Sequence, residues 1–175
     1  MPTSSGQDTG EITLGLGTLT LNGVNVGFLK GDVRFSFARD VKDFEAGVPL
    51  MSQKRVCIRE RAHLRAGLAQ IYTDKLQHAL GAGVIDAPTG STDRIQFGGS
   101  SNVTNYVLDF VHNVPNSSAS ITVHLYRASP MIPIEIPFRE EEFTVFEAEW
   151  GALADLTKSA GQQYGYILFS GFTGS

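Results

Sequence analysis

The sequence predicts a mainly β protein, built as a two-sheet β-sandwich or flattened barrel with one short flanking α-helix. Three observations support this fold class. Apolar and polar residues alternate with period two in several separate segments, as expected for strands with one buried face. Turn residues, many of them among the 19 glycines, separate these segments. A single stretch near residues 73–81 has the apolar spacing of an amphipathic helix.

Length, charge and cysteine content restrict the possible classes of protein. The 175 residues correspond to one domain with a substantial core. The net charge of −4 argues against a nucleic-acid-binding surface, which is normally strongly basic. The first residues lack the basic and apolar regions of a signal peptide, and no run reaches the roughly 18 apolar residues of a membrane span. We therefore expect a soluble protein without membrane anchoring, made in a cytoplasm.

The N-terminal region divides into an arm and the start of the domain. Residues 1–11 are small and polar, and we expect a flexible arm that orders against a partner. The single domain spans residues 12–175. Within it, Ile12–Leu21 alternates, Asn22-Gly23 follows, and Val24–Leu29 returns. Asn-Gly between two alternating runs predicts a hairpin with a type I′ turn.

A third strand, with Phe35 and Phe37 on one face, leads into a predicted long loop at residues 39–53. The loop sequence RDVKDFEAGVPLMSQ is first charged and then carries apolar residues without alternation. Such a loop either docks on a partner or folds back over a sheet edge, and the sequence leaves both interpretations open. The candidate interface residues are Phe44, Glu45, Val48, Pro49, Leu50 and Met51.

The segment Val56–Ile71 predicts one unusually long strand. Its even positions are mostly apolar, whereas its odd positions carry Arg59, Arg61 and Arg65, so we expect one buried and one charged face. Gly67 is the candidate position for a bend or bulge in this strand.

Acidic side chains gather on a later strand that ends near Trp150. If that strand lies beside the arginine strand, cross-strand ion pairs would each stabilise the register by about 0.2–1 kcal/mol. The alternative is a phosphate-binding arginine stripe, which the nearby carboxylates and the negative net charge disfavour. The acidic candidates are Glu140, Glu142, Glu147 and Glu149.

A short helix is predicted after the long strand. Leu76, Ala79 and Leu80 form its apolar stripe, and Gly81 is placed to end it. The following residues, 81–102, are rich in glycine, serine, threonine and aspartate, and we expect an exposed excursion with one short strand.

The remaining strands follow from alternation and from proline positions. Residues 104–112 and 120–127 flank a Pro-Asn-Ser-Ser turn and predict a second hairpin. Three prolines exclude a central strand at residues 129–138. Residues 143–150 and 164–169 are the last two predicted strands.

The sequence contains no recognisable pattern of catalytic or cofactor-binding residues. Its four histidines lack metal-ligand spacing, although His112 and His124 could face each other across the second hairpin. A G-x-S-x-G elbow and a complete phosphate-binding loop are both missing. Cys57, the only cysteine, rules out an intrachain disulfide and is expected to be a packed thiol. We expect no enzymatic activity, no cofactor and no metal.

Four segments resemble the major tail tube proteins of tailed bacteriophages in their order and spacing. They are GTLTLNGVNVGFLKGDVRFSF (Gly17–Phe37), DFEAGVPL (Asp43–Leu50), IRERAHLRAGLAQIYTDKLQHALG (Ile58–Gly81) and FTVFEAEWGALADLTKSAGQQYGYI (Phe143–Ile167). The segment Gly81–Ser118 resembles no part of that family.

The resemblance implies a β-sandwich that forms hexameric rings, stacked into a hollow tube with a β-barrel inner wall. The N-terminal arm and the 39–53 loop would make ring-to-ring contacts. Genomic DNA would pass through the lumen without specific binding, and tape-measure, tail tip and terminator proteins would be partners. The protein would belong to the virion tail, assembled in the host cytoplasm. A related ring-forming secretion tube component and a ligand-binding β-sandwich module are the alternatives.

Overall fold

The computed structural model describes residues 17–27, 29–69, 73–81, 83–89, 92–99, 103–131, 134–136 and 145–172. Within these ranges the protein is mainly β with one short helix, as the sequence predicts. The expected N-terminal arm, residues 1–11, and the candidates Glu140 and Glu142 lie outside the described residues.

The strands form one large and one small sheet, and the helix lies between the fourth and the fifth strand in the chain. In chain order they are β1 (Thr18–Leu21), β2 (Val24–Asn25), β3 (Arg34–Ala46), β4 (Met51–Leu68), α1 (Thr73–Leu80), β5 (Val84–Thr89), β6 (Thr92–Gln96), β7 (Tyr106–Asn113), β8 (Ser120–Pro130), β9 (Phe146–Ala152) and β10 (Gly165–Ser170). Strands β5 and β6 form the small sheet, and the other strands form the large antiparallel sheet.

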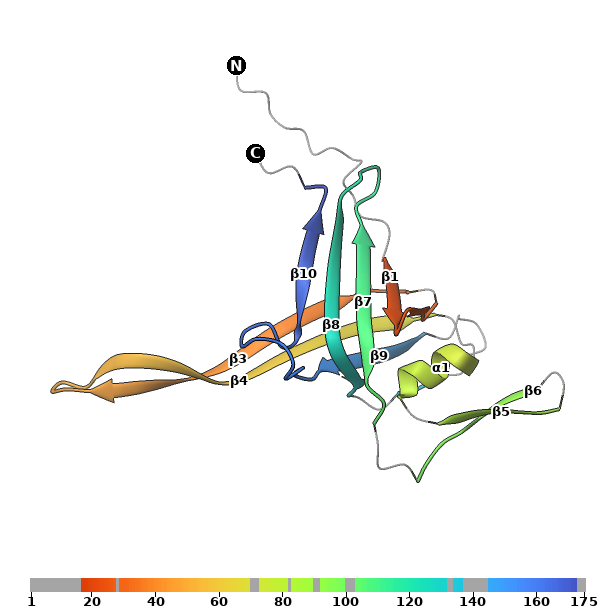
Figure 1. Ribbon diagram of the computed structural model, residues 1–175, viewed down its shortest axis with the longest axis horizontal. Helices are drawn as coiled ribbons and strands as arrows, with labels where there is room; N and C mark the ends of the chain where they lie inside the picture. Colours follow the sequence, from red (N-terminus) through yellow and green to blue (C-terminus); the bar gives the residue numbers. More distant parts are fainter. Residues whose placement is uncertain are drawn as a thin grey trace, which may run out of the picture.

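The large sheet folds into two layers that cross each other (Figure 1). One layer contains β1, β7, β8 and β10, with β2 at its edge, and the other contains β9, β4 and β3. Strand β8 belongs to both, because its residues 120–125 pair with β10 and its residues 128–130 pair with β9. The result is a flattened barrel that is continuous through β8, while β10 and β3, both described in full, are not paired with each other.

Side chains from both layers fill the core. Trp150 on β9 lies directly across from Leu64 on β4, and both are completely buried. Burying one large apolar side chain stabilises the fold by about 1.5–3 kcal/mol. Helix α1 adds the buried Ala79 and the partly buried Leu76. The other large, fully buried side chains are Phe146, Leu19, Leu21, Leu68, Leu108, Leu125 and Val26.

Both hairpins that the sequence predicts are confirmed. Asn22 and Gly23 connect β1 to β2 with φ angles of 51° and 78°, the two positive values that a type I′ turn requires. The Asn22 side chain also accepts a hydrogen bond of 2.7 Å from the backbone N–H of Val107, which ties the turn to β7. Strands β7 and β8 pair across the second predicted turn.

The prediction of a long loop at residues 39–53 is wrong. Strands β3 and β4 continue through this region and pair from Arg34 and Arg65 outward to Ala46 and Met51, so only residues 47–50 form the turn. This hairpin projects from the body of the protein (Figure 1). It lacks a buried face over its outer part, and apolar alternation therefore could not reveal it.

Two β-bulges lie in the paired part of this hairpin. Asp40 pairs with Arg59 but Val41 pairs with Cys57, so Ile58 is an extra residue on β4. Gln53 is skipped in the same way nearer the turn. Each extra residue exchanges the two faces of β4 beyond it relative to β3.

Three smaller expectations about the strands need correction. The register of β4 with β9 is continuous through Gly67, so the strand does not bulge there; instead the backbone O of Lys30 approaches so closely that a Cβ would collide with it. The segment 81–102 contains two paired strands, β5 and β6, and not one. Cys57 is exposed and not packed.

Candidate assembly surfaces

The first candidate surface is the tip of the β3–β4 hairpin, defined here as residues 44–51. The structure brings all six sequence-predicted interface residues together on this tip, and all are exposed: Phe44, Glu45, Val48, Pro49, Leu50 and Met51. Leu50 is 71% exposed and Val48 is fully exposed. Large apolar side chains that gather on one projecting element mark a contact surface more strongly than scattered ones.

Charge pairs across the two strands hold the hairpin together. Arg55 donates two hydrogen bonds to the Asp43 carboxylate, at 2.7 and 2.9 Å. These bonds lower the pKa of Asp43 and raise the pKa of Arg55. Further toward the body, Arg61 pairs with Asp40. The outer hairpin thus depends on polar pairs between its own strands, and its apolar tip residues remain available.

Among the described residues, the predicted arginine and glutamate faces meet at their inner ends. Arg65 pairs with Glu147 across β4 and β9, and the carboxylate raises the pKa of the guanidinium. Glu149 bonds to Nδ1 of His63 at 2.7 Å. The pairing of Arg61 with Asp40 on β3 departs from the prediction, because the pairing of β4 with β9 ends at His63.

Arg59 lies across from Asp40, on the same exposed face of β4 as Arg61 and Arg65. Because carboxylates already pair with Arg61 and Arg65, this face is a poor site for phosphate. The interpretation of the arginines as partners in strand pairing is therefore favoured over a phosphate-binding stripe.

Strand β10 is a second apolar surface, and sequence reasoning missed its exposure. Among the described residues its pairing partner is β8, on one edge. Its side chains are exposed on both faces: Tyr166, Ile167, Leu168 and Phe169 are 44–62% exposed, and Phe172 beyond the strand is 50% exposed. A long apolar strand with one open edge is a site for association with another strand. The signal in the sequence is that both odd and even positions of YILF are apolar, which a half-buried strand does not require.

An apolar groove of about 290 Å³ lies between β10 and the base of the β3–β4 hairpin. Phe35 and Phe37 of β3 line it on one side, and Tyr166 and Ile167 of β10 line it on the other. Leu125 of β8 also lines it. We call this feature the inter-layer groove, since it occupies the side on which the two layers are not joined.

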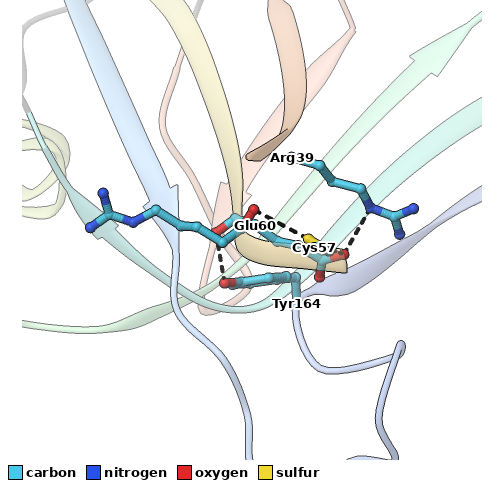
Figure 2. Close-up of polar contacts among 5 residues, drawn as sticks. Arg39, Cys57, Glu60 and Tyr164 are labelled. Carbon is cyan, nitrogen blue, oxygen red and sulfur yellow. Dashed lines mark hydrogen bonds and ion pairs between the residues drawn. The ribbon is translucent and has the colours of Figure 1, made fainter. Parts of the chain in front are cut away.

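Polar contacts line the inter-layer groove, and one of them joins its two sides (Figure 2). The carboxylate of Glu60 on β4 forms an ion pair of 2.8 Å with Arg39 on β3. The Arg39 guanidinium also lies 5.1 Å from the ring centroid of Phe37. The backbone O of Glu60 accepts a hydrogen bond of 3.0 Å from the hydroxyl of Tyr164, just before β10. The charged groups of the groove are therefore already paired.

The histidines do not form a metal site in the part of the chain that the structure describes. His124 lies across from Asp109, whose carboxylate is 2.5 Å from Nδ1, and its ring stacks on Tyr166 with centroids 4.7 Å apart. His112 lies across from Ile121, so the expected approach of His112 to His124 does not occur. This arrangement attaches β10 to β8 and offers a metal too few ligands.

Comparisons with other proteins add no identification: neither the protein-family models nor the curated proteins that were searched match this chain. Within the described residues, the single helix α1 is too short and too polar to cross a membrane.

Proposed function

We propose that this protein is the major tail tube subunit of a tailed bacteriophage, a virion structural protein and not an enzyme. Copies form hexameric rings that stack into a hollow tube through which genomic DNA passes to the host. The observation that carries the proposal is the placement of exposed apolar side chains on two unlike elements, the hairpin tip and β10. Two different contact surfaces on one chain favour head-to-tail association into rings or filaments.

Ring formation is assigned to the layer that contains β10. Among the described residues, this layer ends in the unpaired edge of β10 on one side and in β1 and β2 on the other. Strand addition between unlike edges of neighbouring copies would continue the sheet around a ring and cover the apolar β10. The mainly β fold and the resemblance of residues 17–37 and 143–167 to tail tube proteins support the same assignment.

Stacking is assigned to the hairpin tip, which lies far from the core and buries little in the isolated chain. The net charge of −4 agrees with a lumen through which DNA slides, since a protein that grips phosphates needs clustered basic side chains. Tape-measure, tail tip and terminator proteins are the proposed partners, the virion tail is the proposed location, and assembly takes place in the host cytoplasm. A secretion tube component would use the same contacts.

The inter-layer groove favours a second candidate from another class, a ligand-binding β-sandwich module. A cavity with aromatic walls and a few polar groups is the usual form of a small-molecule site. This candidate predicts monomers at every protein concentration and saturable binding of an apolar fluorescent probe.

Electron microscopy of negatively stained protein over a concentration series tests the proposal. We expect rings or hollow tubes that increase with concentration, both for the protein alone and with tail tip components added. Monomers under both conditions would overturn the proposal.

Two variants assign the contacts. Deletion of residues 43–51 should leave rings but no tubes, because it removes the whole tip. The deletion leaves Ser52–Arg55 as a four-residue loop between Lys42 and Val56, which already pair, so the shortened hairpin can close. Leu168→Glu on β10 should prevent rings, whereas Leu156→Glu, at an 81% exposed position on neither surface, should not.

A further inference from the structure

The inter-layer groove and the hairpin tip match each other chemically. Residues 46–51 of the tip carry no charged side chain. The charged residues lining the groove, Arg39 and Glu60, pair with each other, so an apolar segment could enter without leaving a buried charge unpaired. Phe37, Tyr166 and Ile167 are each 44–48% exposed along the groove, and an inserted segment would cover them.

A chain cannot place its own tip in its own groove. Phe37 lies on the same hairpin as the tip, nine residues before Ala46. At ~3.3 Å per residue this separation is about 30 Å along a paired strand. The hairpin also points away from the body that contains the groove (Figure 1). The occupant must therefore come from another molecule.

We propose that the inter-layer groove receives the hairpin tip of a second copy of this chain. The proposal rests on the self-association proposed above and names its contacts: Val48 and Leu50 of one copy pack against Phe37 and Ile167 of the next. Each chain carries one tip and one groove, so every copy can give and receive one contact, and the association continues from copy to copy. The groove lies between β10 and the β3–β4 hairpin. An inserted tip would therefore contact β10, so the two surfaces assigned to assembly, the tip and β10, would meet between neighbouring copies.

Disulfide trapping tests the contact directly. In a Cys57→Ser background, Leu50→Cys and Ile167→Cys are introduced together, and the protein is oxidised over a concentration series up to the highest soluble concentration. We expect covalent dimers and a ladder of higher species. The matched control combines Leu50→Cys with Leu156→Cys, which is exposed but does not line the groove. Absence of crosslinking, or equal crosslinking in the control, would overturn the proposal.

A charge exchange provides a second test at the same exposed positions. Leu50→Glu should raise the concentration for half-maximal assembly by at least about tenfold, and Ile167→Lys should restore it. Leu156→Lys should give no restoration. If Ile167→Lys and Leu156→Lys behave alike, the tip does not contact the groove.

The two proposals can fail separately. Tubes that form without the Leu50–Ile167 crosslink would retain the tail tube assignment and exclude this contact. A specific crosslink in samples that never form rings or tubes would retain the contact and exclude the tail tube assignment.

Discussion

Arg65 on β4 lies directly across from Glu149 on β9, yet its guanidinium pairs with Glu147, and Glu149 bonds to His63. The charged side chains thus pair diagonally, with a residue two positions along the neighbouring strand. Glu149 is 19% exposed at its side chain and Glu147 is 59% exposed, so the two bonds lie in different environments. A partly buried hydrogen bond contributes more to stability than an exposed ion pair.

Glu149→Ala should therefore lower the free energy of unfolding by about 1 kcal/mol. Glu147→Ala should have a smaller effect, because solvent screens the exposed pair with Arg65. Urea denaturation followed by the fluorescence of Trp150, the single tryptophan, measures both changes. Equal losses in the two variants would show that burial does not distinguish these bonds.

Two substitutions of Asn22 distinguish the contribution of its positive φ angle to stability from that of its side-chain hydrogen bond. Asn22→Gly keeps the positive φ but loses the bond to the N–H of Val107, and it should cost about 0.5–1.5 kcal/mol. Asn22→Ala loses the same bond and also places a Cβ that disfavours positive φ, which adds roughly 1 kcal/mol. The expected order of stability in urea is wild type, Asn22→Gly, Asn22→Ala. Equal stability of the two variants would contradict a contribution from the backbone angle.

These turns and the buried strands could be predicted from the sequence because their signals are local. Asn22-Gly23 needs only two residues to specify its turn, and the even positions from Ala62 to Leu68 face one core. The outer β3–β4 hairpin could not be predicted, since its strands bury no apolar face that alternation would reveal, and ion pairs replace such a face.

Of the candidate surfaces, one could likewise be found from the sequence and one could not. The sequence marks the residues of the tip as candidate interface residues, because Val48 and Leu50 are apolar in a segment without alternation, although it leaves open whether they dock or fold back. The inter-layer groove could not be found, since it depends on Phe37 and Ile167 approaching from elements far apart in the chain. Whether an apolar strand such as β10 is buried or exposed depends on which strands pair beside it. The sequence of the strand itself does not specify its pairing partners.

The Asp43–Arg55 pair predicts that the stability of the folded hairpin depends on pH at acidic pH. Its hydrogen bonds lower the pKa of Asp43 in the folded hairpin below the ordinary value of 3.8. The contribution to stability is therefore complete above about pH 5 and is lost as the pH falls toward the lowered pKa. Arg55→Ala should raise the pKa of Asp43, measured by the chemical shift of its carboxyl carbon. The control is Asp155, whose pKa is lowered by Thr157 and should not change. An unchanged Asp43 titration would contradict the bond to Arg55.

The tip should tolerate substitutions that the core does not. Leu50→Glu should change the free energy of unfolding by less than about 0.5 kcal/mol, because Leu50 is 71% exposed. Leu64→Ala, at a completely buried position, should cost about 2–5 kcal/mol. Thermal unfolding at a concentration below that of assembly makes the comparison. Comparable losses would mean that the tip contributes to the fold of the single chain.

Trp150 combines complete burial with an Nε1–H that has no hydrogen-bond partner among the described residues. Trp150→Ala should cost about 3–5 kcal/mol through the cavity that it leaves against Leu64. Trp150→Phe removes the unsatisfied donor along with part of the ring, and relief of its desolvation cost, about 1–3 kcal/mol, offsets much of the lost packing. Circular dichroism during urea denaturation measures both variants without the tryptophan signal, with Phe146→Ala as the matched cavity control. If Trp150→Phe costs as much as Phe146→Ala, the Nε1–H does have a partner in solution, and the indole is held by a bond as well as by packing.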